Sequence, residues 1–208
     1  MSIINCQLVS KSFGKVKALE RISFDVQPGE LFGIIGPDGA GKTTLFRILT
    51  TLILADTGTV RVDGKDVVKD FKAIRNEVGY MPGRFSLYQD LTVEENIQFT
   101  KDIYGTSIDI AEILEMTALL KYRDIPVGKL PIPLKKMSHF ACVLSTDFDL
   151  LILEEPSMSF DDDSNQKLIE LSKILKNQGK GIAIFTAKKI DLNYCDRVYY
   201  IETLEGVN

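Results

Sequence analysis

Gly36-Pro37-Asp38-Gly39-Ala40-Gly41-Lys42-Thr43-Thr44 is the stretch that decides the fold of this chain. It matches G-x-x-x-x-G-K-S/T, a loop that joins a buried strand to a helix and wraps phosphate groups. The apolar run at 31–35 precedes the loop and a helically spaced run at 44–49 follows it, so its setting is the expected one. We therefore expect a nucleoside triphosphate to bind here. Lys42 would reach the β- and γ-phosphates, and the Thr43 hydroxyl would hold Mg²⁺ at the helix N-terminus.

The composition of the chain is that of an ordinary globular domain. Of its 208 residues 45% are hydrophobic and 26% are charged, which is enough apolar material for a core of its own. The net charge of -4 argues against a nucleic-acid binder, because no basic surplus exists to neutralise phosphates. Cys6, Cys142 and Cys195 lack metal-ligand spacing, so we expect buried thiols in a reducing compartment. With no signal peptide or membrane span visible, we expect a cytoplasmic protein whose membrane role comes through a partner.

Hydrophobic periodicity predicts an α/β fold. Strands are expected over 3–9, 22–26, 31–35 and 59–62 before a helical stretch, and over 150–153, 182–185 and 198–201 after it. Helices are expected over 92–104, which opens with the capping-box sequence Thr92-Val-Glu-Glu95, and over 109–120 and 162–176. Residues 1–208 would then form one nucleotide-binding domain, with a core lobe of about 1–84 and 145–208 and a helical subdomain of about 85–144.

With these pieces in place, the chain resembles the nucleotide-binding subunit of ABC transporters over nearly its whole length, from Cys6 to about Ile201. The likeness is carried by the phosphate loop together with Lys11-Ser-Phe-Gly14, Val78-Gly-Tyr-Met-Pro82, Phe85-Ser-Leu-Tyr88, Asp90-Leu-Thr-Val-Glu-Glu-Asn96, Asp149 to Pro156 and Cys195-Asp-Arg-Val198. It looks most like the branch that powers exporters of drugs or lipids. The resemblance implies a P-loop core with a mostly parallel sheet flanked by helices, an N-terminal antiparallel β part and a helical subdomain.

The resemblance also assigns roles to single residues. Phe13 matches the aromatic residue that stacks on adenine, and Glu155 matches the carboxylate that acts as general base towards water. Glu154 stands where the family has a magnesium-binding aspartate, one methylene shorter. Asp161 matches an aspartate at the dimer interface, although an acidic start to a helix explains it equally well. The implied ligands are ATP and Mg²⁺. The implied partners are a membrane permease and a second ATP-binding domain, as a homodimer or heterodimer, at the inner face of the membrane.

Three further active-site positions depart from the family pattern. Gly83 replaces a glutamine that senses Mg²⁺, and Leu130-Pro-Ile-Pro-Leu134 replaces the signature Leu-Ser-Gly-Gly-Gln or Leu-Ser-Gly-Gly-Met. That signature works through a serine hydroxyl and glycine N–H groups, which prolines do not have. The histidine expected after the strand at 182–185 is missing, with Lys188 as its expected counterpart, and His139 is interpreted as structural. We therefore expect impaired hydrolysis.

Three hypotheses stay open on the sequence. The chain is a working ABC ATPase that powers an exporter as a homodimer, or it is the degenerate ATP-binding half of an asymmetric or tandem pair with a regulatory role. The third hypothesis is a non-transport ABC protein, which ranks last because the sequence has no second phosphate loop, long linker or basic surplus. An intact phosphate loop beside altered coupling residues favours ATP binding with weak or partner-dependent hydrolysis.

Overall fold

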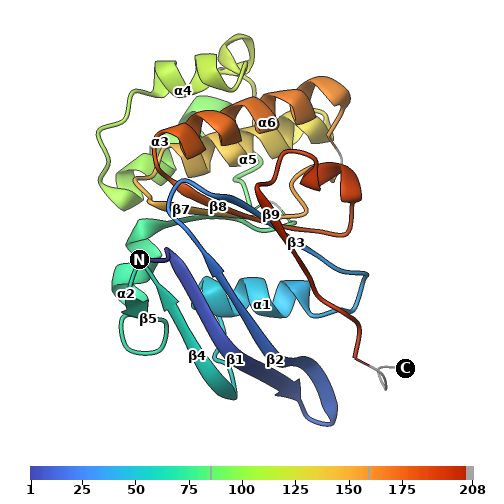
Figure 1. The fold of residues 1–208 in the computed structure, drawn as a ribbon. Helices are drawn as coiled ribbons and strands as arrows, with labels where there is room; N and C mark the ends of the chain where they lie inside the picture. Colours follow the sequence, from blue (N-terminus) through green and yellow to red (C-terminus); the bar gives the residue numbers. More distant parts are fainter. Residues whose placement is uncertain (85, 159, 205–208) are drawn as a thin grey trace.

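The strands of this computed structural model, which describes residues 1–84, 86–158 and 160–204, form two sheets (Figure 1). Sheet A is antiparallel, in the order β2-β1-β4-β5, and contains β1 (Ile4–Phe13), β2 (Val16–Val26), β4 (Thr57–Val62) and β5 (Lys65–Asp66). Sheet B is parallel, in the order β6-β7-β8-β3-β9, and contains β6 (Val78–Met81), β7 (Leu150–Glu154), β8 (Gly181–Thr186), β3 (Leu31–Ile35) and β9 (Arg197–Tyr200). The expected fold, a parallel core sheet with an antiparallel N-terminal part, is confirmed.

The helices take two positions relative to the sheets. Helix α1 lies between sheet A and one face of sheet B, whereas the other face of sheet B is covered by helices that follow β6 in the chain (Figure 1). The α-helices are α1 (Lys42–Leu49), α2 (Phe71–Glu77), α3 (Val93–Tyr104), α4 (Ile110–Met116), α5 (Ile132–Leu144) and α6 (Asp162–Asn177), with shorter 3-10 turns at Leu120–Tyr122, Val127–Lys129 and Lys189–Leu192. The capping box predicted from Thr92 to Glu95 is confirmed at the start of α3. The helix expected over 109–120 ends earlier, at Met116, and Ala118 beyond it adopts a positive φ of 56°.

Two hydrophobic cores lie on opposite faces of sheet B. Leu150 and Ile152 of β7 pack into the core shared with α1 and sheet A. Leu151 and Leu153 pack into the other core, among the side chains of α3, α5 and α6. Because both faces of the sheet are covered, its strands read in the sequence as continuous apolar runs rather than as an alternation.

The strand order places the candidate site residues at one edge of sheet B. Strands β3, β7 and β8 are parallel neighbours, so their carboxyl ends meet at the same edge. The phosphate loop follows β3, residues 154–155 close β7, and Thr186 ends β8. In open parallel sheets this edge is where ligands bind.

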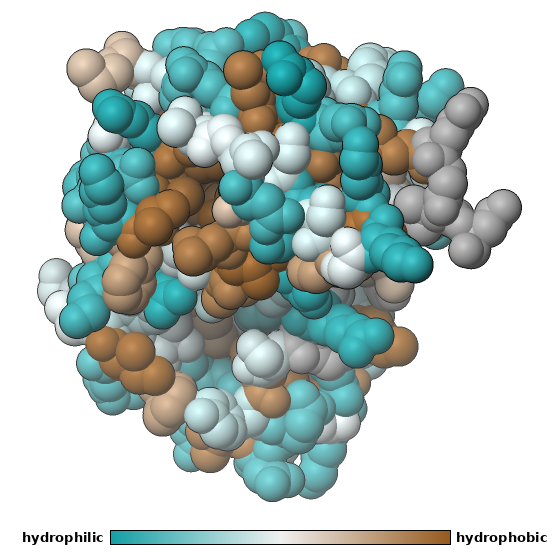
Figure 2. Space-filling model, turned by 90° about the horizontal axis from the view of Figure 1, so that it is seen from below, coloured by the Kyte–Doolittle hydropathy of each residue, from teal (hydrophilic) through white to brown (hydrophobic). Residues whose placement is uncertain are grey.

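The surface is mixed in character. Seen from below the view of Figure 1, hydrophobic side chains gather around a hollow within a largely hydrophilic face (Figure 2). Among the helices in the described ranges, none is long and hydrophobic enough to cross a membrane. Cys6 and Cys142 are buried, and this burial raises the pKa of each thiol to about 12, whereas Cys195 is half-buried. Phe85, where the predicted helical subdomain begins, lies outside the described residues.

Candidate functional site

The phosphate loop curls because two of its glycines adopt backbone angles that other residues disfavour. Gly39 has a φ of 83° and Gly41, the N-cap of α1, has a φ of 92°. A Cβ atom added at Gly41 would lie 2.2 Å from the carbonyl oxygen of Ala18 in β2, so only glycine fits this close approach. No side chain caps the first turn of α1 at this residue, which leaves its N–H groups to an anion.

Lys42 holds its ammonium group over the loop. The side chain is only 7% exposed, and its Nζ donates to the main-chain oxygens of Gly36 (2.8 Å) and Pro37 (3.1 Å). The same Nζ lies 3.8 Å from Oε1 of Glu155 and 3.9 Å from Oδ1 of the exposed Asp38. The positive charge predicted to meet phosphates is therefore held in place beside the candidate base.

Glu154, at the end of β7, connects two segments of the site. Its Oε1 accepts a hydrogen bond from the Thr43 hydroxyl, and its Oε2 accepts one from the main-chain N–H of Gly83 at 3.1 Å. The two residues predicted to hold Mg²⁺, Thr43 and Glu154, are thus in direct contact. A hydroxyl and a carboxylate are oxygen donors of the kind that Mg²⁺ takes in proteins, so this donor set fits the ion.

Glu155 is held in a strained conformation at the centre of the site. Its φ is 45°, in the left-handed region that a residue with a side chain rarely adopts. Its main-chain N–H donates to Phe185 (2.7 Å), and its Oε2 lies 3.4 Å from the Thr186 hydroxyl and 3.3 Å from the N–H of Ala187. Lys188, the expected counterpart of the family histidine, is exposed, and its main-chain N–H donates to Thr186. The sequence reading missed Thr186, although its place at the end of β8 is a usable signal.

The phosphate loop and Glu155 face a cleft of about 310 Å³ beside sheet A. Val16, Lys17 and Ala18 of β2 line one wall, and the phosphate loop with Glu155 lines the other. Phe13 pairs with Val16 across the turn between β1 and β2, and its side chain is 51% exposed. An exposed aromatic ring next to the rim is placed where a flat base could stack on it.

Other residues singled out in the sequence lie away from this cleft. Pro131 is the N-cap of α5 and Ile132 is exposed, so the altered signature segment forms an exposed helix start. Asp161 is the N-cap of α6, where its bond from Ser164 N–H (2.9 Å) accounts for its place in the sequence. That hydrogen bonding to Ser164 also lowers the pKa of the Asp161 carboxyl. His139 is buried in α5, and burial lowers its pKa to about 4, with the charge of Lys136 as a smaller cause.

Comparison with known proteins gives the same picture. The model of the family described as ABC transporter matches residues 19–158. The chain is 30% identical over 202 residues to "Probable multidrug ABC transporter ATP-binding protein YbhF" of Escherichia coli K12, covering 95% of this chain and 35% of that protein. It is 34% identical over 205 residues to "Nod factor export ATP-binding protein I" of Burkholderia lata, covering 96% of this chain and 67% of that protein. The chain therefore spans about a third of the length of the first relative and about two thirds of the second.

Solved structures agree on the fold. A structure described as the ATP binding subunit of an ABC transporter superposes with a TM-score of 0.89 at 24% identity, covering 97% of this chain and 87% of that one. The family match covers the phosphate loop, the altered signature segment and both glutamates at the end of β7. This chain is an ATP-binding domain of the ABC transporter family.

Proposed function

We propose that this chain is the ATP-binding subunit of an ABC exporter, which binds MgATP in the cleft beside sheet A and acts with a second ATP-binding domain and a membrane permease. One observation carries the proposal: the ends of β3 and β7 bring Lys42 and Thr43 together with Glu154 and Glu155 at one edge of sheet B, although the two segments are far apart in the sequence. A positive charge, an uncapped helix start and two carboxylates at one edge form an arrangement suited to a triphosphate and its cation.

The names of the relatives support export as the direction of transport. One relative described above is named for Nod factor export, and the other is named as a probable multidrug ABC transporter protein. A further structural neighbour, with a TM-score of 0.87 at 21% identity, is described as a dimeric bacterial ABC transporter cassette. In such a dimer the phosphate loop of one domain would face α5 of the other.

The start of α5 is the reason to propose weak or partner-dependent hydrolysis. Pro131 and Pro133 offer no N–H to an anion, and the side chain of Ile132 is 54% exposed in front of the helix end. Gly83, in turn, contacts Glu154 only through its main chain and has no side chain to place near a cation. This chain therefore keeps the residues that would bind ATP. The signature segment that faces the nucleotide across a dimer would be supplied best by a different ATP-binding domain.

We also propose a docking surface for the permease on α3 and the segment before it. The rings of Tyr88 and Phe99 meet edge to face at 4.8 Å while both stay exposed, and Ile103 on the next turn of α3 is 64% exposed. Exposed apolar side chains grouped in this way mark interaction sites in soluble domains.

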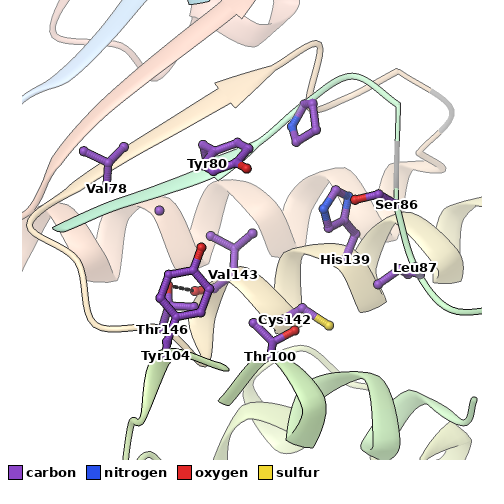
Figure 3. A pocket seen from close by; sticks show the side chains of 12 residues that line it. Val78, Tyr80, Ser86, Leu87, Thr100, Tyr104, His139, Cys142, Val143 and Thr146 are labelled. Atoms are coloured by element: carbon purple, nitrogen blue, oxygen red, sulfur yellow. Dashed lines mark hydrogen bonds between the residues drawn. The ribbon is translucent and has the colours of Figure 1, made fainter. Parts of the chain in front are cut away.

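A pocket of about 170 Å³ opens beside this group, between β6, α3 and α5 (Figure 3). His139 and Ser86 lie at one end of the pocket, and Tyr104 and Thr146 lie at the other. The exposed apolar side chains around the pocket and the polar groups that line it would suit an amphipathic segment of a membrane protein.

ATP binding and turnover by the purified chain test the proposed function. We expect Lys42→Ala to weaken MgATP binding by about a hundredfold, because a charge-assisted contact to the phosphates is lost. Lys17→Ala is the matched control, since Lys17 lines the same cleft but is exposed and pairs with Glu20. Its affinity should stay within about twofold of the wild type.

The same titration separates the remaining hypotheses. Replacing Mg²⁺ by a chelator should weaken binding in the wild type if Thr43 and Glu154 hold the ion. Binding with turnover near background supports the degenerate partner, and turnover abolished by Lys42→Ala supports the working homodimer. Absence of any ATP binding would contradict the proposed function in either form.

A further inference from the structure

A buried lysine on α5 reaches under the turn that carries Glu155. Lys136 is 2% exposed, and its Nζ donates to the main-chain oxygens of Glu155 (2.5 Å) and Met158 (2.7 Å). The same Nζ lies 5.7 Å from the centre of the Phe160 ring. The ammonium group therefore contacts both ends of the turn that follows β7.

Packing alone gives no reason for a lysine at this position. Withdrawing an ammonium group from water is costly unless hydrogen bonds compensate it, and a methionine would fill a similar volume without that cost. Lys136 meets the cost with bonds to carbonyl oxygens of the turn. These bonds are an observed use of its charge, and one of them ends at Glu155, the candidate general base.

The turn needs such support because Glu155 is strained. For a residue with a side chain, a φ of 45° is an unfavourable backbone conformation that persists only where the surroundings hold it. Among the described residues, three hydrogen bonds hold the main chain of Glu155: its N–H donates to Phe185, and its oxygen accepts from Met158 N–H (3.1 Å) and from Lys136. Of these hydrogen bonds, the one from Lys136 is donated by a side chain of α5.

We propose that Lys136 is a positioning residue for Glu155, which fixes the strained turn from α5 so that the carboxylate stays beside Lys42 and Ala187. This inference rests on the proposed function, because it assigns Lys136 a part in the work of the same site. Lys136 itself touches neither nucleotide nor water in this scheme. It acts through the main-chain oxygen of Glu155, and the direction of that peptide group sets where the side chain points.

Two substitutions at Lys136 and one control test the proposal in the full chain. Lys136→Met keeps the length and removes the donors, whereas Lys136→Arg keeps a charge and donors. Lys135→Met is the matched control, because Lys135 is the next residue of α5 and also donates to a carbonyl, but to that of Gly128 (2.9 Å), away from the turn. For each variant we would measure the Kd for MgATP, kcat and KM, and the hydrogen exchange of the amides of Glu155 and Met158.

We expect Lys136→Met to lower kcat at least about tenfold while Kd and KM stay within about twofold, because a displaced base slows chemistry without removing phosphate contacts. Lys136→Arg should recover most of the rate, and Lys135→Met should match the wild type. The two amides should exchange at least about tenfold faster in Lys136→Met alone. Unchanged kcat with unchanged exchange in Lys136→Met would overturn the proposal, as would equal losses in Lys135→Met.

The exchange measurement keeps this inference separate from the proposed function. If the wild type binds no ATP, the proposed function fails, and faster exchange in Lys136→Met still supports a link between α5 and the turn. If the wild type binds ATP without turnover, the exchange result alone decides. A Lys136→Met variant with wild-type exchange at Glu155 and Met158 then overturns the inference.

Discussion

Glu154 illustrates how one methylene group alters the contacts available at a site. Its carboxylate reaches the Thr43 hydroxyl and the Gly83 N–H together. A Cβ added at Gly83 would meet Glu154 atoms at 3.7 Å or more, which is ordinary contact, so space exists for a side chain there. The missing glutamine is therefore a matter of chemistry rather than of crowding.

Burial of His139 makes the free energy of unfolding depend on pH. Its pKa is 6.5 in the unfolded chain and about 4 in the fold, because burial disfavours the charged ring. A lowered pKa means that the unfolded state binds the proton more readily, so stability is lost as pH falls from 6.5 to about 4. The loss of stability is on the order of 3–4 kcal/mol.

Replacing this histidine should therefore reduce the loss of stability at acidic pH. We expect His139→Leu to show less change in the free energy of unfolding between pH 6.5 and 4 than the wild type, as measured by urea denaturation at each pH. At neutral pH the ring is uncharged in the folded state, so the difference in the free energy of unfolding between the two proteins there reports the change in packing alone. Parallel curves for the two proteins would contradict the assignment of this limb to His139.

At the same scale, sequence reasoning found the groups that belong to a local motif and missed those that depend on tertiary contact. The phosphate loop and Glu155 were predicted from neighbouring residues in the chain. Lys136 was not, because its partners are main-chain oxygens and nothing in a helical sequence tells which carbonyl group it will meet. The predicted roles of the site residues, from Phe13 and the phosphate loop to Glu154, Glu155 and Asp161, all stay predictions, since the structure gives the positions of these residues without testing what they do.

Helix α5 is the element on which we propose that the rate of ATP hydrolysis depends. Its N-cap, Pro131, has the extended angles φ -64° and ψ 157°, and Pro133 sits in the first turn, where a missing N–H costs the helix nothing. The sequence change is thus compatible with the helix and affects only what the helix end can offer to an anion.

Restoring those donors should raise turnover. We expect the triple variant Pro131→Ser, Ile132→Gly, Pro133→Gly to hydrolyse ATP at least about tenfold faster than the wild type, because preorganised donors at a helix start stabilise developing charge. Steady-state turnover measures it, with the same triple variant carrying Lys42→Ala as the control for contaminating activity. A folded triple variant with wild-type turnover would place the limitation elsewhere.

Elements that carry a clear apolar pattern were predicted well, even where they are short, and elements without such a pattern were not. The capped helix α3 was expected from 92 to 104 and runs from Val93 to Tyr104. Helix α2 was not predicted, because among its seven residues only Ile74 is buried and no repeating apolar pattern can arise. Strand β2 begins at Val16, six residues before the expected start. Most side chains in its first half are exposed or half-buried, so this part of the strand has no apolar pattern in the sequence.

At the scale of the whole molecule, the docking surface and the nucleotide cleft occupy different parts of the fold. Ile103 belongs to α3, which packs on the core that α1 does not share. We expect Ile103→Glu to abolish co-purification with the proposed membrane permease and leave the Kd for MgATP unchanged, because only an exposed apolar contact is lost. Affinity purification from detergent extract measures the first, and nucleotide titration measures the second.

Ile174→Glu is the control for this prediction. Ile174 is also an exposed isoleucine on a helix, at 44% exposure on α6, and it is not part of the proposed docking surface. Loss of the permease in both variants would point to a general effect of added charge. Retention of the permease by Ile103→Glu would remove this surface from the proposed partner contact.

The pairing of β3 also has a consequence for synthesis on the ribosome. This strand delivers the phosphate loop, yet both its neighbours in sheet B, β8 and β9, begin only at Gly181 and Arg197. While the chain is being translated, β3 has neither neighbour until residues beyond 180 have left the exit tunnel. We therefore expect the phosphate loop to reach its folded shape late in synthesis, although it is translated well before β8 and β9.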